Sequence, residues 1–156
     1  MRDDAAMAPL IASRRADLVL MHRRGGQSEG YEGPAYDDVV EDVRAFLLDR
    51  ARAAERAGIE RRHIAIDPGI GFGKTVQENL ALIANVRRLA DTEYPVLIGA
   101  SRKSFIGKLT GVETPRERDP ASVWIAVEAA RLGAAIVRVH DVAGTRQALA
   151  VSAAMR

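Results

Sequence analysis

Three short stretches of the sequence hold side chains that could bind an anion or a flat polar ring. Asp67 precedes a glycine-rich stretch, Lys103 lies within Ser-Arg-Lys-Ser, and Arg138 and His140 are two residues apart. Side chains alternate along a strand, so Arg138 and His140 share a face of any strand that holds both. Just before the last predicted helix, they would form an anion site. Arg138 and Lys103 donate hydrogen bonds and accept none, so they favour an anionic or carbonyl-bearing substrate.

The glycine-rich stretch Asp67-Pro-Gly-Ile-Gly-Phe-Gly-Lys-Thr75 is similar to nucleotide-binding motifs but matches neither of the two common ones. A phosphate-binding P-loop requires glycine where Pro68 stands, and the dinucleotide fingerprint requires glycine where Lys74 stands. What remains is a loop whose backbone can approach a flat ligand closely, beside a carboxylate that accepts hydrogen bonds from an amino-amide edge.

Four apolar segments of the chain, residues 17–22, 63–67, 95–101 and 135–140, end in polar or charged side chains. Short continuous apolar runs are typical of strands buried on both faces of a parallel sheet. The carboxyl ends of such strands form the ligand site in α/β folds. We therefore expect one cavity among the polar residues at these ends: His22, Asp67, Ser101, Arg102, Lys103, Arg138 and His140. For each residue taken singly, a structural role such as capping a loop stays open.

Helical patterns separate these segments, at residues 4–14, 37–57, from Thr75 onward, 119–133 and 145–154. Thr75 and Glu78 have the spacing of a capping box, and Asp119 before Pro120 is typical of a helix cap followed by a first-turn proline. Trp124, at helical spacing among apolar residues, is predicted to belong to the core. The segment 23–36, rich in glycine and charge, is predicted to be a mobile loop over the site.

The predicted order is one helix followed by four βα pairs, which defines the α/β class with parallel strands. The strand segments begin at residues 17, 63, 95 and 135, so one unit averages about 39 residues. Eight such units would need about 315 residues, the size of a complete (β/α)8 or TIM barrel. With 156 residues and no dividing linker, the chain is predicted to be one domain, 1–156, holding half of such a barrel. Four strands leave two open edges, through which two copies could pair.

The composition excludes several classes of protein. A net charge of +2 and 4% aromatic residues provide neither a basic nucleic-acid surface nor a base-stacking platform. Without cysteine the chain has no disulfide framework, thiolate zinc site or cysteine nucleophile. The apolar runs are far shorter than the roughly 20 residues that span a bilayer. The first residues, Met-Arg-Asp-Asp, lack the pattern of a signal peptide, so we expect a cytoplasmic protein.

Taken together, these motifs resemble those of the dihydropteroate synthase family, and the resemblance runs through nearly the whole chain. The stretch 67–74 is similar to the family's signature loop, with Asn79-Leu80 at the start of the following helix. Leu20-Met-His22 is similar to its fifth strand, and Gly99-Ala-Ser-Arg-Lys-Ser104 and Arg138-Val-His-Asp141 resemble its seventh- and eighth-strand motifs. The resemblance implies a transferase of folate biosynthesis. It joins 6-hydroxymethyl-7,8-dihydropterin diphosphate to 4-aminobenzoate, forms dihydropteroate and releases diphosphate.

The resemblance also implies how the pterin is held. Asp67 would hydrogen-bond the 2-amino and N3 edge of the pterin ring, and Lys103 its carbonyl side. Arg138 would lie against the face of the ring. Met21 and Gly99 would form an apolar floor around it.

For the rest of the substrates, the resemblance assigns residues to the diphosphate and to the aminobenzoate. Arg138, Val139 and His140 would hold the diphosphate leaving group. Phe72 and Ser104 would line the aminobenzoate pocket. The residues implied to be catalytic are Lys103, Arg138 and His140.

The family also implies Mg²⁺ on the diphosphate, held by an asparagine from the first barrel strands, so no metal ligand is expected in this chain. The loop that starts at Arg23 differs from the family's usual shorter segment. Two other functions stay open: a pterin-binding methyltransferase domain, which would release no diphosphate, and a non-catalytic half-barrel assembly module. The expected partners are pterin diphosphate, 4-aminobenzoate and a second copy of the chain, with neither nucleic acid nor membrane.

Overall fold

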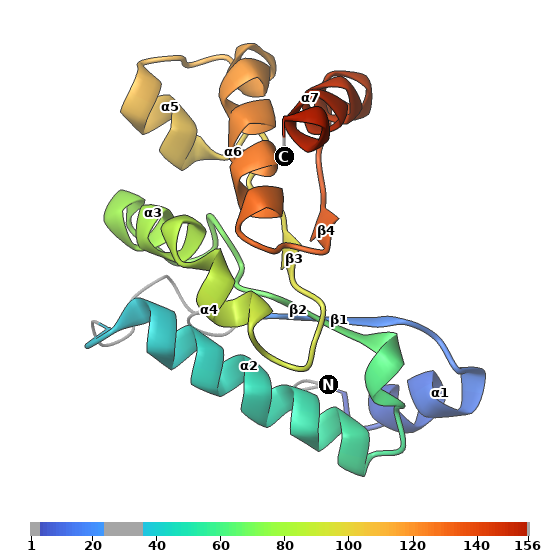
Figure 1. Ribbon diagram of the computed structural model, residues 1–156. Helices are drawn as coiled ribbons and strands as arrows, with labels where there is room; N and C mark the ends of the chain where they lie inside the picture. The colour runs from blue at the N-terminus through green and yellow to red at the C-terminus, as the bar shows by residue number, and fades with distance from the viewer. Residues whose placement is uncertain (1–3, 24–35, 156) are drawn as a thin grey trace.

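A computed structural model describes residues 4–23 and 36–155 of the protein, and in this part of the chain short strands alternate with helices (Figure 1). The elements are α1 (Met7–Arg14), β1 (Leu18–Met21), α2 (Val39–Arg56), β2 (Ile64–Asp67), α3 (Val76–Ala84), α4 (Val86–Ala90), β3 (Leu97–Ile98), α5 (Ser104–Thr110), α6 (Asp119–Arg131), β4 (Ile136–Val137) and α7 (Val142–Ala154). Single turns of 3-10 helix, Arg61–His63 and Pro115–Arg118, precede β2 and α6.

The described strands are parallel, as the sequence predicts. β1 and β2 pair along all four residues and end with Met21 beside Asp67. β3 and β4 pair along both of their residues. A single parallel bridge between Ile66 and Val96 joins the two pairs, which gives the order β1-β2-β3-β4. The predicted α/β class with parallel strands is therefore confirmed for this chain.

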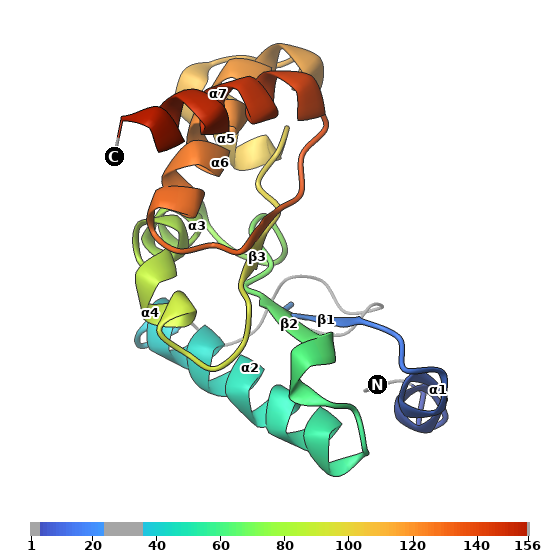
Figure 2. The same cartoon turned by 45° about the vertical axis from the view of Figure 1, so that its right-hand side comes forward.

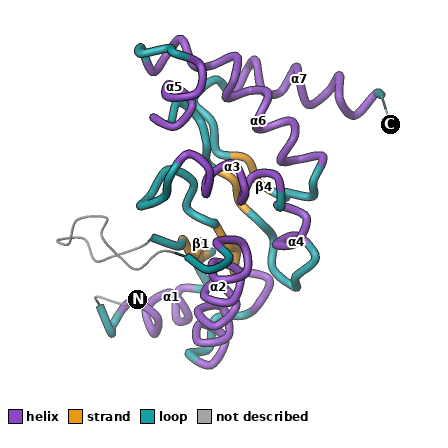
Figure 3. Tube along the Cα trace, turned by 90° about the vertical axis from the view of Figure 1, so that its left-hand side faces the viewer, coloured by secondary structure: helices purple, strands orange, loops and turns teal. Residues whose placement is uncertain are grey.

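The helices cover the outer face of the strands. Figure 2 shows α2, α4, α3 and α6 following one another along one side of them, and in Figure 3 the strands, in orange, lie between α2 and α6. The outward-facing Ile64, Ile66 and Ile98 are buried in the same apolar core as Leu47 of α2 and Leu82 of α3. Burial of apolar surface in this layer is the main stabilising contribution to the fold.

Two of the helices begin with the caps that their sequences indicate. The Asp38 carboxylate accepts hydrogen bonds from the backbone N–H groups of Val40 and Glu41 at the start of α2. Thr75 and Glu78 form the predicted capping box of α3. The helix predicted after Thr75 is broken at Asn85 into α3 and α4, because the Asn85 side chain donates to the Ala81 carbonyl and its backbone leaves the helical range. None of the helices in the described ranges is long and apolar enough to cross a membrane.

Three local features differ from the sequence predictions. α5 was not expected, because it is seven residues long and ends at Gly111 in the left-handed conformation. The last helix begins at Val142 rather than Thr145, since the Asp141 carboxylate caps it through the backbone N–H of Gly144. Asp119 is the first residue of α6 rather than its cap.

The spacing of Trp124 predicted a core residue, but Trp124 does not belong to the core. Its exposed fraction is 66%, because α6 turns Ser122, Ile125, Ala126 and Ala129 inward. The segment predicted to be a mobile loop over the site lies, at residues 24–35, outside the described residues.

Candidate active site

Asp67 is the buried acid at the centre of the predicted site. It is the last residue of β2, and only 1% of it is exposed. One carboxylate oxygen accepts a hydrogen bond of 2.7 Å from the backbone N–H of Gly69, two residues along the glycine-rich loop. Burial raises the pKa of Asp67 above its ordinary value, and the Gly69 N–H and the nearby cations Arg138, Lys74 and Lys103 oppose that shift. The carboxyl group is therefore shielded from water and held in place by Gly69, with its second oxygen directed toward Arg138.

Arg138 reaches Asp67 from the other side of β3. Its Nη2 lies 3.4 Å from the second carboxylate oxygen, and 58% of the arginine side chain is exposed. The guanidinium passes directly over Gly99, where a Cβ atom would lie 2.9 Å from Nη2. Glycine at position 99 therefore provides the space in which Arg138 lies flat beside the acid, with donors still available to a ligand.

Lys103, which follows β3, completes this group of charged side chains. Its Nζ lies 3.7 Å from the centroid of the Phe72 ring, the geometry of a cation–π contact. Its stem fills the space beside Gly71, where a Cβ would lie 2.9 Å from Cδ of the lysine. Burial, and then the charge of Arg138, lower the pKa of Lys103, while Asp67 opposes the change. The three predicted residues Asp67, Lys103 and Arg138 thus lie together.

The glycine-rich loop is fastened by two side chains whose roles the sequence analysis missed. The Lys74 ammonium donates to the carbonyl oxygens of Gly69 (3.0 Å) and Phe72 (3.1 Å). The buried Asn79 accepts from the Gly71 N–H at 2.6 Å, and its amide donates to the Thr75 carbonyl at 2.7 Å. Asn79 was noted only as part of a motif. An amide so close after a glycine-rich loop is the sequence signal that could have indicated this role.

Ser101 and Arg102 both follow β3, but they point to different places. The Ser101 hydroxyl accepts from the backbone N–H of His140 at 3.2 Å and lies 2.9 Å from Nδ1 of the same histidine. Arg102 forms two hydrogen bonds of 2.7 Å with the Asp119 carboxylate. The hydrogen bond from Arg102 is the main reason why the pKa of Asp119 lies below its ordinary value. Arg102 is therefore a structural cation, whereas Ser101 links β3 to His140.

The remaining predicted residues surround the charged group at varying depth. Met21, beside Asp67 in the sheet, is 38% exposed. Ser104 begins α5 and lines an open polar cleft of about 440 Å³ together with Gly71 and Gly73, the neighbours of Phe72. Val139 instead lines a narrow space between β3 and α6, together with Ile98 and Ile125.

The side chain of His22 does not join this group, although its backbone N–H donates to the Asp67 carbonyl. It is buried, and its ring lies 5.0 Å from the Phe46 ring of α2 in an edge-to-face arrangement. The structural role that was left open for this histidine is the one that the fold gives it.

The described residues do not fit a magnesium site. No group of three His, Asp or Glu side chains among them could hold a metal ion. Asp67, the acid of the charged group, already receives the Gly69 N–H and faces Arg138. The Mg²⁺ implied by the resemblance therefore stays a prediction.

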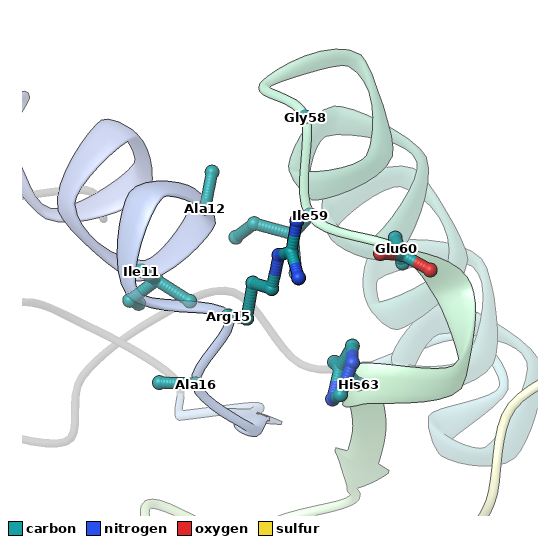
Figure 4. A pocket seen from close by; sticks show the side chains of 8 residues that line it. All are labelled: Ile11, Ala12, Arg15, Ala16, Gly58, Ile59, Glu60 and His63. Atoms are coloured by element: carbon teal, nitrogen blue, oxygen red, sulfur yellow. The ribbon is translucent and has the colours of Figure 1, made fainter.

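A second cavity lies at the opposite end of the strands, between α1 and the turn before β2 (Figure 4). It measures about 20 Å³, and its lining residues are Ile11, Ala12, Arg15, Ala16, Gly58, Ile59, Glu60 and His63. A volume of this size holds one water molecule and excludes any ring. A ring-shaped ligand therefore does not fit in this space.

Comparison with known proteins shows the family to which the chain belongs. The family model of pterin-binding enzymes matches residues 1–140, so the chain belongs to the pterin-binding enzyme family. Within it, the chain is 46% identical over 156 residues to the dihydropteroate synthase of Mycobacterium leprae, a match that covers 96% of the chain and 55% of that protein. The resemblance noted in the sequence is thereby confirmed.

Solved structures of dihydropteroate synthases are similar to this chain over about half of their length. The dihydropteroate synthase of Xanthomonas albilineans with 4-aminobenzoic acid gives a TM-score of 0.90 at 45% identity, over 97% of this chain and 54% of that one. The same enzyme in complex with 7,8-dihydropteroate gives 0.89 at 45% identity, over 97% of this chain and 55% of that one. The chain therefore spans about half the length of the relatives that it matches.

Proposed function

We propose that this chain provides the pterin- and diphosphate-binding half of a dihydropteroate synthase. The observation that carries the proposal is the convergence of Asp67, Arg138 and Lys103 at the carboxyl ends of β2, β3 and β4. A buried acid, a flat cation over a glycine and a partly desolvated ammonium match the donor and acceptor edges of a pterin. Membership of the family supports the same assignment.

In this proposal the pterin ring enters the space between Arg138 and Lys103. Asp67 accepts hydrogen bonds from the 2-amino group and N3 of the ring, and the Lys103 ammonium donates to its carbonyl oxygen. Arg138 stacks on the ring face, and Met21 and Gly99 form the floor. The absence of a side chain at position 99 supports this stacking role, because the guanidinium already lies flat there.

The proposed reaction requires no covalent intermediate with the protein. The bond between the pterin methylene carbon and the diphosphate oxygen breaks, and the electron pair leaves with the diphosphate. Arg138 and His140, with the backbone at Val139, stabilise the charge that develops there. The amine nitrogen of 4-aminobenzoate, held by Phe72 and Ser104, forms the new bond to that carbon and then loses a proton.

A methyltransferase would have no diphosphate to release. The hydrogen-bond donors at Arg138 and His140 therefore favour the synthase over the methyltransferase alternative.

We also propose that the chain corresponds to half of a (β/α)8 barrel and associates through its open strand edges. Apolar side chains on the inner face of the edge strands support this: Val19 is 43% exposed on β1, and Ile136 is 42% exposed on β4. Unpaired parallel edges of this kind are templates for further strands. A second copy would cover both.

Light scattering tests the association. Val19→Lys and Ile136→Lys are expected to lower the apparent mass at a given concentration. Leu109→Lys is the matched control, since this exposed leucine lies on α5 away from the strands. A wild-type chain that is monomeric at every concentration would refute the association.

Calorimetry and a diphosphate-release assay test the function. The chain is expected to bind 6-hydroxymethyl-7,8-dihydropterin diphosphate and 4-aminobenzoate. Turnover by the chain alone would show that it is a sufficient synthase. Binding without turnover would identify a half-site, and failure to bind the pterin diphosphate would overturn the proposal and leave the assembly module.

A further inference from the structure

Ser101, which the residue assignments above do not use, is buried and hydrogen-bonded to His140, which is exposed. Ser101 is 7% exposed. Its Oγ accepts a hydrogen bond from the backbone N–H of His140 at 3.2 Å. The same oxygen lies 2.9 Å from Nδ1 of the His140 ring.

The hydroxyl of Ser101 has one proton to donate, and the two contacts determine where it goes. One lone pair of Oγ takes the backbone N–H, so that contact leaves the hydroxyl proton without an acceptor. Among the described residues, the other hydrogen bond of this hydroxyl is the one to Nδ1. If Nδ1 carried the ring proton, Oγ would accept twice and its own buried O–H would have no acceptor, which is unfavourable. The arrangement is satisfied when Nδ1 is an acceptor and the ring proton is on Nε2.

We propose that Ser101 is a positioning residue that holds His140 in the tautomer with its proton on Nε2, so that the ring presents an N–H donor to an anionic oxygen. The backbone contact fixes the chain at His140, and the hydroxyl contact fixes the ring about its χ angles. Both contacts come from one atom, so the histidine is oriented before any ligand arrives. The anion rests on the proposed function, in which it is the diphosphate, whereas the tautomer does not.

The ring proton can be located directly by long-range ¹H–¹⁵N correlation spectra of the chain labelled with ¹⁵N at its three histidines. His140→Gln identifies the His140 signals by their disappearance. In the wild-type chain, the His140 signals are expected to show an unprotonated Nδ1 and a protonated Nε2. A wild-type ring with its proton on Nδ1 would overturn the proposal without recourse to any variant.

Ser101→Ala is expected to give a mixture of the two tautomers, and Ser101→Thr, which keeps the hydroxyl, is expected to retain the wild-type pattern. A merely structural serine would leave the Nδ1 and Nε2 shifts unchanged in the folded alanine variant, and that result would also overturn the proposal.

Binding of inorganic pyrophosphate separates this proposal from the proposed function. Ser101→Ala is expected to weaken pyrophosphate binding by about 10-fold, the size of one hydrogen bond. In the His140→Ala background the same change is expected to have no further effect, because the two residues act as a unit. Additive effects would contradict the positioning role. A wild-type chain that does not bind pyrophosphate would count against the diphosphate site and leave the tautomer result standing.

Discussion

The guanidinium of Arg138 lies directly over Gly99, so close that a β-carbon on residue 99 would be only 2.9 Å from Nη2. Gly99→Ala is therefore expected to displace Arg138 from Asp67. Because the displaced atoms are the end of a flexible side chain, the free energy of unfolding should change by only about 0.5 kcal/mol. Pterin diphosphate binding should weaken by up to about 150-fold. Urea unfolding measures the change in stability, and calorimetry measures the change in affinity. An unchanged affinity would contradict the role of Gly99 in making space for Arg138.

Removal of the Arg138 guanidinium shows how much pterin diphosphate affinity depends on this side chain. Arg138→Ala is expected to weaken pterin diphosphate binding by about 10- to 150-fold, the size of one charge-assisted hydrogen bond. Arg87→Ala, an exposed arginine on α4, is the matched control and should bind like the wild type. Equal losses in the two variants would indicate a general charge effect rather than a contact with the ligand.

Asp67→Asn should separate stability from binding. Burial raises the pKa of Asp67, so its contribution to stability is present below the ordinary pKa and is lost as pH rises through the folded-state value. At neutral pH the asparagine variant should be more stable by about 1 kcal/mol and lose most of its pterin affinity. The gain should shrink as the solution is made acidic. Thermal unfolding across pH measures this, and a destabilised variant at neutral pH would show that the Arg138 contact outweighs burial.

Lys103 should make ligand binding sensitive to alkaline pH. Its pKa lies below the ordinary value because of burial and Arg138, so it loses its proton earlier than a free lysine. The same lowered pKa makes the folded state gain stability relative to the unfolded state as pH rises through that range. Pterin affinity, which requires the charged ammonium, should fall over the same range. Lys103→Met should remove this alkaline decline, and Lys108→Met should keep it. A decline that persists in Lys103→Met belongs to another group.

Asn79 should be needed to keep the glycine-rich loop in place. Asn79→Ala leaves the Gly71 N–H without its partner and should cost about 1 to 3 kcal/mol in urea unfolding. Asn85→Ala is the control, because that side chain makes a single hydrogen bond at the end of α3 and should cost about 1 kcal/mol or less. Affinity for 4-aminobenzoate should fall only in the Asn79 variant, since Phe72 lies on the loop. Similar effects in both variants would show that Asn79 does not organise the site.

The position of the charged residues could be predicted from the sequence because it follows from strand geometry. Asp67, Lys103 and Arg138 each stand at or just after the end of an apolar segment, and parallel strands bring such ends together. No long-range information is needed beyond the direction of the strands. The pairing of Met21 with Asp67 follows from the same parallel register.

The features that were missed depend on contacts that a single segment does not contain. Trp124 shares its helix with apolar neighbours on more than one side, and only the position of the sheet decides which side is buried. The direction of the loop carbonyls toward Lys74 follows from positive φ angles at Gly69, Gly71 and Gly73. Residues of the chain alone do not fix these angles, since glycine adopts either sign.

The carbonyl contacts of Lys74 also explain why this loop differs from the nucleotide-binding loops that its sequence approaches. A phosphate-binding loop turns N–H groups toward its ligand and places its lysine against the anion. Here the carbonyl oxygens of Gly69 and Phe72 turn inward and accept hydrogen bonds from the ammonium group of Lys74. This loop thus surrounds a bound group with carbonyl oxygens, whereas a phosphate-binding loop does so with N–H groups. Its glycines create a binding site for an internal cation, and the anion is left to Arg138, which approaches Asp67 from β4.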